Sequence, residues 1–161
     1  MEAAELQSRL REAFHSRQRP EKDAITSCTC WECTEIRDDF GGAEPEDLPD
    51  KLMGYHCYDL GFMKPEARLY FLRGWMVLAI RQPDRPFDEA VCDILCRDDT
   101  WIEESKPSDG QIAVMIAFLE FLRDRSDDRP DRERTRALEV LRSFNRPSEN
   151  RQAEQAGAQN P

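Results

Sequence analysis

The feature that most constrains this chain is an apolar stretch over residues 65–80, which leaves almost no polar side on a helix. Pro65 suits the first turn of a helix, and Glu66 complements the positive end of the helix dipole. Its apolar side chains are Leu69, Tyr70, Phe71, Leu72, Trp75, Met76, Val77, Leu78 and Ile80. A helix that is apolar nearly all round belongs at the centre of a core. The stretch is too short to cross a bilayer and contains Arg68 and Arg73.

A second helix of the same character is predicted over residues 111–122. Ser108 and Gln111 fit a capping box, with serine at the N-cap and glutamine three positions later. The residues that follow, from Ile112 to Leu122, are almost all apolar. We therefore predict that this helix packs directly against 65–80, so that the two shield each other from water.

Four shorter stretches carry the apolar stripe of an amphipathic helix. The stripes are Leu6, Leu10, Ala13 and Phe14; Cys33, Ile36 and Phe40; Phe87, Val91, Ile94 and Leu95; and Ala137, Leu138, Leu141 and Phe144. Residues 43–62 are interrupted by proline and glycine, which predicts a loop with at most one short helix. Strand and hairpin signals are nearly absent. The predicted fold is all-α: one compact domain of five or six helices over 1–146, followed by a disordered tail over 147–161.

The charge balance narrows the classes of partner. The chain has 161 residues with 23 basic and 33 acidic side chains, for a formal net charge of −10. Such a field repels phosphate backbones, which argues against nucleic acid as a partner, and no apolar run predicts a membrane span. The acidic N-terminus lacks a hydrophobic signal region, so we expect a cytoplasmic protein with reduced cysteines.

Acidic side chains gather in residues 32–50, where eight of them face one basic residue, Arg37. We interpret the later part of this segment as a docking face for a basic partner protein. Complementary charge of this kind raises the association rate more than the affinity. The alternative is a solvated loop. The predicted partner-binding residues are Glu44, Glu46, Asp47 and Asp50.

Three of the six cysteines lie within six residues, at Cys28, Cys30 and Cys33. Cys-x-x-Cys is the spacing at which two thiolates share one Zn²⁺, and a helix start favours the thiolate form. A fourth ligand would come from Cys57 or His56, with His15 as a further candidate. The alternatives are a redox-active pair and cysteines that pack in the core without a cofactor.

The usual catalytic motifs are missing, and the chain has two histidines. Enzyme activity would therefore require a site that the sequence does not reveal, such as a pocket lined by His56, Tyr58 and Asp59. The aromatic residues Trp31, Tyr55, Tyr58 and Phe62 would either anchor a partner or close the top of the core. We expect the second role.

Short motifs resemble a bacterial family that is known only as a domain of unknown function. They are Ala13-Phe14, Cys30-Trp31-Glu32-Cys33-Thr34-Glu35, Asp39-Phe40-Gly41-Gly42 and Pro65-Glu66-Ala67 leading into Tyr70-Phe71-Leu72. The resemblance covers about residues 9–122, and the chain departs from it at Arg73-Gly74, where the family pattern has a proline. It implies a bacterial source and a cysteine pair as a family feature, and it carries no activity.

Together these features favour a small acidic module that binds another protein. It would neutralise a basic effector, as immunity proteins do. The alternatives are a helical domain stabilised by zinc at Cys28, Cys30 and Cys33, and an enzyme with an unrecognised site.

Overall fold

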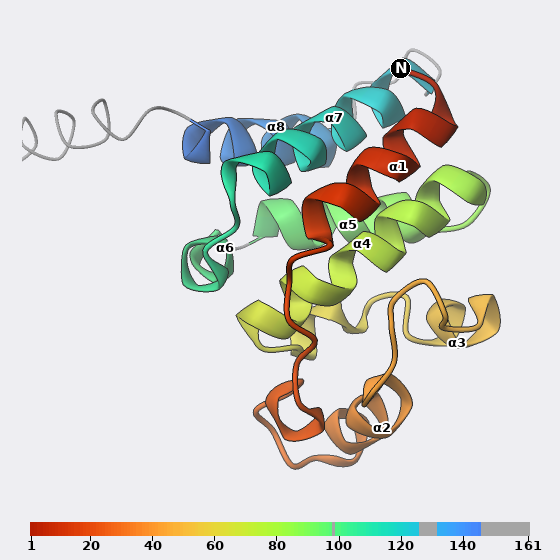
Figure 1. Cartoon of the computed structure of the whole chain (residues 1–161), viewed down its shortest axis with the longest axis vertical. Coiled ribbons are helices and arrows are strands. Elements are labelled where there is room, and N and C mark those ends of the chain that lie inside the picture. The colour runs from red at the N-terminus through yellow and green to blue at the C-terminus, as the bar shows by residue number, and fades with distance from the viewer. Residues whose placement is uncertain (98, 126–131, 146–161) are drawn as a thin grey trace, which may run out of the picture.

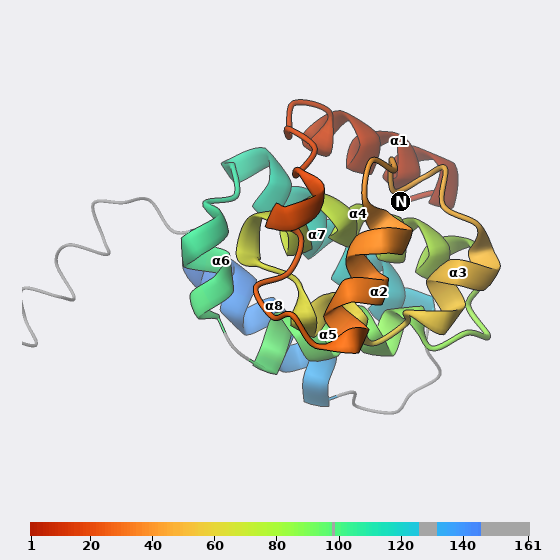
Figure 2. The same ribbon diagram turned by 90° about the horizontal axis from the view of Figure 1, so that it is seen from below.

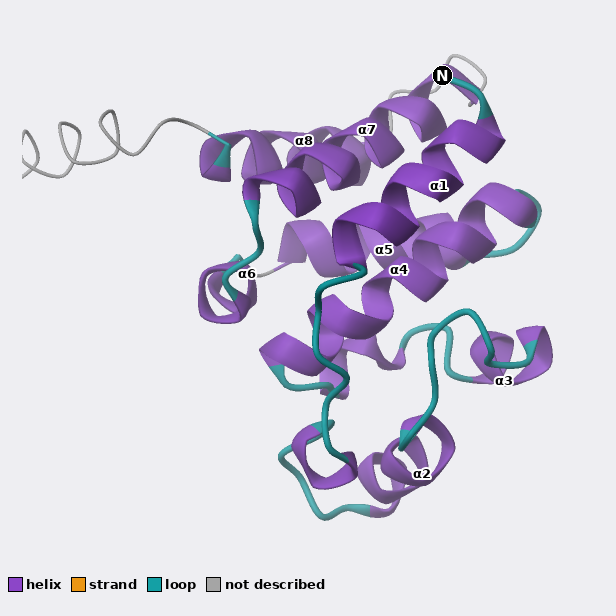
Figure 3. Cartoon of the chain, viewed as in Figure 1, coloured by secondary structure: helices purple, strands orange, loops and turns teal. Residues whose placement is uncertain are grey.

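The computed structural model describes residues 1–97, 99–125 and 132–145, and within these ranges the chain forms helices and loops without a strand (Figures 1 and 3). The α-helices are α1 (Ala3–Phe14), α2 (Trp31–Phe40), α3 (Asp50–Tyr55), α4 (Pro65–Arg81), α5 (Phe87–Arg97), α6 (Thr100–Ser105), α7 (Asp109–Arg125) and α8 (Arg132–Phe144). Two 3₁₀ turns, η1 (Lys22–Ala24) and η2 (Asp59–Phe62), precede α2 and α4. The predicted all-α fold is confirmed. The predicted disordered tail lies outside the described residues.

Helix α4 is the centre of the structure, as the apolar stretch predicts. Every side chain from Leu69 to Ile80 is buried, including Arg73. The surrounding elements α1, α5, α6 and η2 cover its circumference. Within the described ranges, none of the helices combines the length and the apolar character needed to span a bilayer.

Helix α7 does not pair with α4 in the way that its apolar character suggests. Its principal neighbours are α1 and α8, whereas α4 packs against α5, α1 and α6. The predicted direct pairing of the two apolar helices is therefore wrong, and α1 contacts both of them instead. Helix α7 meets α4 at one end, where Arg125 donates to the Ile80 carbonyl at 3.3 Å, and its Ile116, Ala117 and Phe121 side chains are half-buried.

Local signals place the helix ends well. The Ser108 amide donates to Gln111 Oε1 at 3.0 Å, and the Gln111 amide donates to Ser108 Oγ at 3.2 Å, which confirms the capping box. Helix α5, at 87–97, contains the whole apolar stripe from Phe87 to Leu95 from which a helix is predicted. Helix α6 has six residues, too few for a helical period to show in the sequence.

Residues 22–63 form a separate layer, here called the α2–α3 lobe, which lies below the other helices in Figure 1 and faces the viewer in Figure 2. It attaches to α4 through aromatic packing: the Phe40 ring stacks on Trp75 with centroids 5.7 Å apart. The Trp75 indole N–H also donates to the Cys57 carbonyl at 2.8 Å. An isolated antiparallel bridge pairs Thr26 with Met63, just before α4 begins. The lobe carries all five cysteine and histidine residues of the predicted metal site.

Candidate functional site

The three clustered cysteines meet at the N-terminus of α2. Their sulfur atoms all lie within 4.8 Å of one another, with Cys28 exposed, Cys30 half-buried and Cys33 buried. Cys30 occupies the N-cap position, and its amide N–H donates to Cys28 Sγ at 3.1 Å. Cys33 points to the core on the same stripe as Ile36 and Phe40. The spacing therefore brings all three sulfurs to one point, close enough to hold one metal ion.

Arg37 fixes the extended segment before α2 against the helix. Its guanidinium donates to Thr26 Oγ1 at 2.7 Å and to the Cys28 carbonyl at 2.6 Å. It also donates to Thr34 Oγ1, within α2, at 3.0 Å. Thr26 Oγ1 in turn donates to the Cys33 carbonyl at 3.3 Å. This network holds Cys28 beside the helix start and places a positive charge near its sulfur. In the sequence, Arg37 stands out only as the single basic residue in 32–50.

A hydrogen bond between their side chains makes the thiols of Cys28 and Cys30 differ in pKa. The hydrogen bond from the Cys30 side chain is the main cause that lowers the pKa of Cys28, and the Arg37 charge lowers it further. The same hydrogen bond raises the pKa of Cys30 to about 11. Cys28 is thus the thiol that loses its proton first, and a thiolate is the form that binds metal or acts as a nucleophile.

The structure does not bring the predicted fourth ligands to this group. Among the described residues, no histidine, carboxylate or further cysteine joins Cys28, Cys30 and Cys33. Cys57 is buried, and burial is the main cause that raises its pKa to about 11. His15, on the polar stretch after α1, is exposed and does not join the group either.

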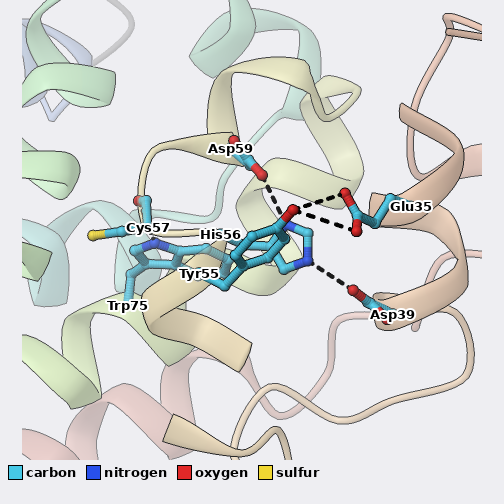
Figure 4. Close-up of polar contacts among 7 residues, drawn as sticks. All are labelled: Glu35, Asp39, Tyr55, His56, Cys57, Asp59 and Trp75. Carbon is cyan, nitrogen blue, oxygen red and sulfur yellow. Dashed lines mark hydrogen bonds and ion pairs between the residues drawn. The ribbon is translucent and has the colours of Figure 1, made fainter. Parts of the chain in front are cut away.

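His56 has another role, shown in Figure 4. Its side chain is 1% exposed and lies between two carboxylates: Nε2 is 2.8 Å from Asp39 Oδ2, and Nδ1 is 2.7 Å from Asp59 Oδ2. The ring also meets Phe40 and Tyr55 edge-on. Both nitrogens are therefore engaged in a contact that joins α2 to η2, and neither is free to ligate a metal.

The predicted acidic docking face is largely paired within the chain. Glu44 and Glu46 both contact the buried Arg73 guanidinium, at 2.9 and 3.0 Å. Glu44 also accepts a hydrogen bond from Tyr70, and Asp50 accepts one from Gln82 and lies 3.7 Å from Arg81. Of the four predicted residues, Asp47 alone is exposed without an ion pair among the described residues. Within the folded chain, Glu44 and Glu46 of this segment neutralise the buried positive charge of Arg73 on α4.

The aromatic residues of the lobe face solvent instead of closing the core, so that expectation is wrong. Trp31 is 69% exposed, Tyr55 64%, Tyr58 58% and Phe62 49%. Tyr55 donates to Glu35 at 3.2 Å, and Glu35 lies one helical turn after Trp31 (Figure 4). The aromatic core under α2 consists instead of Phe40, Phe71 and Trp75, whose rings contact one another through Phe40.

His56, Tyr58 and Asp59, whose meeting in one pocket would point to an enzyme, differ in their surroundings: among the described residues His56 is buried and Tyr58 is exposed. Tyr58 lines a shallow hollow together with Glu89, Asp93, Arg97 and Glu133, and neither His56 nor Asp59 belongs to it. In Figure 4 the His56 ring lies behind Tyr55, and the Asp59 carboxylate is turned toward it.

Comparison with known proteins adds no identification: no family model, no curated protein and no solved structure matches this chain. The resemblance to a bacterial family of unknown function accordingly stays a prediction.

Proposed function

We propose that this chain is a small helical domain that binds Zn²⁺ through Cys28, Cys30 and Cys33. The observation that supports the proposal is the meeting of three sulfur atoms within 4.8 Å at the start of one helix. Zn–S bonds of about 2.3 Å place two tetrahedral thiolates about 3.8 Å apart. The sulfurs need to close by at most about 1 Å around an ion, and Cys28 lies outside the helix, in the segment just before α2.

The type of ligand favours zinc over the harder cations. Mg²⁺ and Ca²⁺ bind oxygen ligands, whereas three thiolates without a carboxylate suit a soft or borderline ion. The N–H···S bond from Cys30, the helix N-terminus and Arg37 all favour negative charge on sulfur. With three protein ligands, water completes the tetrahedron.

Zinc would fasten the α2–α3 lobe. The ion would join the segment that ends at Cys28 to the first turn of α2, and so add to the hydrogen bonds that Arg37 and Thr26 form there. An ion that binds only the folded state stabilises it by about 2.7 kcal/mol when its free concentration is a hundredfold above Kd. We expect this gain to be lost when a chelator is added.

The test measures zinc in protein purified under reducing conditions. We expect about one equivalent per chain by elemental analysis, and the loss of most of it in Cys28→Ser and Cys30→Ser. Cys96→Ser is the matched control, because Cys96 lies half-buried on α5, away from the group. A zinc content below about 0.1 equivalent, with the same melting temperature in chelator, would overturn the proposal.

The same preparation separates zinc from disulfide exchange. Alkylation followed by mass spectrometry shows whether Cys30 and Cys33 are thiols or a disulfide after exposure to air. A Cys30–Cys33 disulfide in protein that takes up no zinc under reducing conditions would support the redox alternative instead.

A further inference from the structure

The exposed end of the α2–α3 lobe combines aromatic rings with two carboxylates that form no ion pair within the described residues. Trp31 and Tyr55 are the two most exposed aromatic side chains of the described residues. Glu32 and Glu35 lie beside them at the start of α2, and within the described residues neither carboxylate forms an ion pair. We call these four residues, Trp31, Glu32, Glu35 and Tyr55, the aromatic–acidic surface.

The surface is continuous and held in place. Trp31 and Glu35 are four residues apart on α2 and therefore lie on one face of the helix. The hydroxyl group of Tyr55 donates to both carboxylate oxygens of Glu35, at 3.2 and 3.4 Å. Its ring rests edge-on against the buried His56, with centroids 4.9 Å apart (Figure 4). Tyr55 is thus fixed from behind while its face stays open to solvent.

The chemistry of the surface selects cations. Aromatic faces attract guanidinium and ammonium groups, and a carboxylate beside the ring adds a charged acceptor. Residues 32–50 contain eight acidic side chains and one basic one, and Arg37 is occupied with Thr26, Thr34 and Cys28. The other carboxylates nearby, Asp38, Asp39 and Asp59, already contact Lys22 or His56. This leaves Glu32 and Glu35 as the acceptors for an outside cation.

We propose that the aromatic–acidic surface is the docking site for an arginine-rich segment of another protein. An arginine side chain would stack on Trp31 or Tyr55 and donate to Glu32 or Glu35. Arginine fits better than lysine because its planar guanidinium both stacks on rings and binds carboxylates in a bidentate way. The proposal moves the predicted basic partner from Glu44, Glu46, Asp47 and Asp50 to a different face. It does not depend on zinc.

The test uses a synthetic peptide of alternating arginine and glycine as the probe, in reductant and chelator so that zinc plays no part. Trp31 reports the contact directly, because the other two tryptophans, Trp75 and Trp101, are at most 2% exposed. We expect the peptide to change Trp31 emission, and a peptide with lysine at the same positions to bind more weakly.

Two charge-matched variants separate a specific site from general attraction to an acidic protein. Glu32→Gln/Glu35→Gln should weaken peptide binding about fivefold, while Glu103→Gln/Glu104→Gln, which removes two exposed carboxylates from α6, should change it less than twofold. Trp31→Ala should weaken binding by about threefold without loss of helix content.

Three outcomes would overturn the proposal. One is an absence of binding to the wild-type chain, and another is equal weakening by the two double variants, which would mean that net charge alone attracts the peptide. The third is a dimer in solution that Trp31→Ala dissociates, because a second copy of the chain would then occupy the surface.

Discussion

At the scale of single residues, Arg37 does the most to shape the candidate metal site. Its guanidinium reaches Thr26, the Cys28 carbonyl and Thr34, so one side chain connects the extended segment to the helix that follows it. It contacts no sulfur in these bonds. Arg37 is therefore a positioning residue, which sets where the Cys28 sulfur lies and adds positive charge near it.

Replacing Arg37 should weaken metal binding without touching a ligand. We expect Arg37→Met to lower zinc affinity about tenfold and the free energy of unfolding by about 2 kcal/mol, since three hydrogen bonds are lost. Arg97→Met is the control, because Arg97 forms an exposed ion pair with Asp93 on α5. Competition with a chromophoric chelator gives the affinities. Equal zinc affinity in Arg37→Met and wild type would remove the positioning role.

The thiols should differ in reactivity in a predictable order. A lowered pKa means that Cys28 is deprotonated at a lower pH than an ordinary thiol, mainly because Cys30 donates to it. Cys57, with its pKa raised to about 11, stays protonated at neutral pH. We expect iodoacetamide to modify Cys28 first and zinc to protect it. Mass spectrometry of a time course at several pH values measures this, and equal rates at Cys28 and Cys57 would contradict it.

At the scale of elements, two glycines in helices have opposite surroundings. A Cβ at Gly74 of α4 would lie 3.1 Å from Pro45 Cβ, 3.2 Å from Met53 Cε and 3.3 Å from the Pro45 carbonyl oxygen. A Cβ at Gly54 of α3 would meet nothing within 4 Å. The lobe can lie close against α4 because position 74 has no side chain.

These surroundings predict opposite signs for the same substitution. Gly74→Ala should lower the free energy of unfolding by about 1 kcal/mol, because crowding against Pro45 exceeds the gain in helix propensity. Gly54→Ala should raise it by about 0.5 kcal/mol, since only the propensity changes. Urea unfolding of both variants measures the difference. A stabilised Gly74→Ala would show that Pro45 and Met53 move aside freely.

Local sequence patterns predict where the helices lie, but they do not predict which helices pack against each other. The stripe Cys33, Ile36 and Phe40 identifies the buried face of α2, and the Ser108–Gln111 pair identifies the start of α7. Both signals depend on residues within one or two turns. The mistaken pairing of 65–80 with 111–122 arises because apolar character shows that a helix is covered, but not which helix covers it.

The ligands of the candidate metal site show the same difference between local signals, which the sequence reveals, and tertiary contacts, which it does not. Three ligands within six residues are visible in the sequence, because one helix start brings them together. The proposed fourth ligands, His56 and Cys57, lie further along the chain, and their positions depend on packing against Asp39, Asp59 and Trp75. The exposure of Trp31 and Tyr55 likewise depends on Phe40 and Phe71 having filled the space beneath them.

At the scale of the whole molecule, the structure has a bundle around α4 and the α2–α3 lobe attached to one side of it (Figures 1 and 2). Ion pairs strengthen the attachment, since Arg73 of α4 binds both Glu44 and Glu46. The net charge of −10 does not indicate which acidic side chains form ion pairs within the folded chain. Counting charges along the sequence does not reveal that Glu44 and Glu46 form a contact between two layers of the folded chain.

This division predicts where zinc should act. We expect zinc to slow amide hydrogen exchange in residues 28–37 and to leave the amides of α4 unchanged. Local openings limit exchange in the lobe, whereas the α4 core opens only on global unfolding. Exchange followed by NMR with and without zinc measures both regions. Equal protection throughout the chain would mean that the lobe and the bundle open as one unit.

The backbone pairing of Thr26 with Met63 has one further consequence. The Lys64 amide also donates to the Ile25 carbonyl at 2.8 Å. The two backbone segments that enter and leave the lobe are therefore hydrogen-bonded to each other. Residues 27–62, which carry the clustered thiols and the exposed aromatic rings, thus form one long loop of the backbone whose two ends are held together. A loop closed in this way tolerates a change of length, because closing a longer loop costs little more entropy. A peptide tag inserted at Gly42, a loop glycine with φ of 80° whose carbonyl accepts a hydrogen bond from Arg19, should leave the bundle folded, which circular dichroism measures.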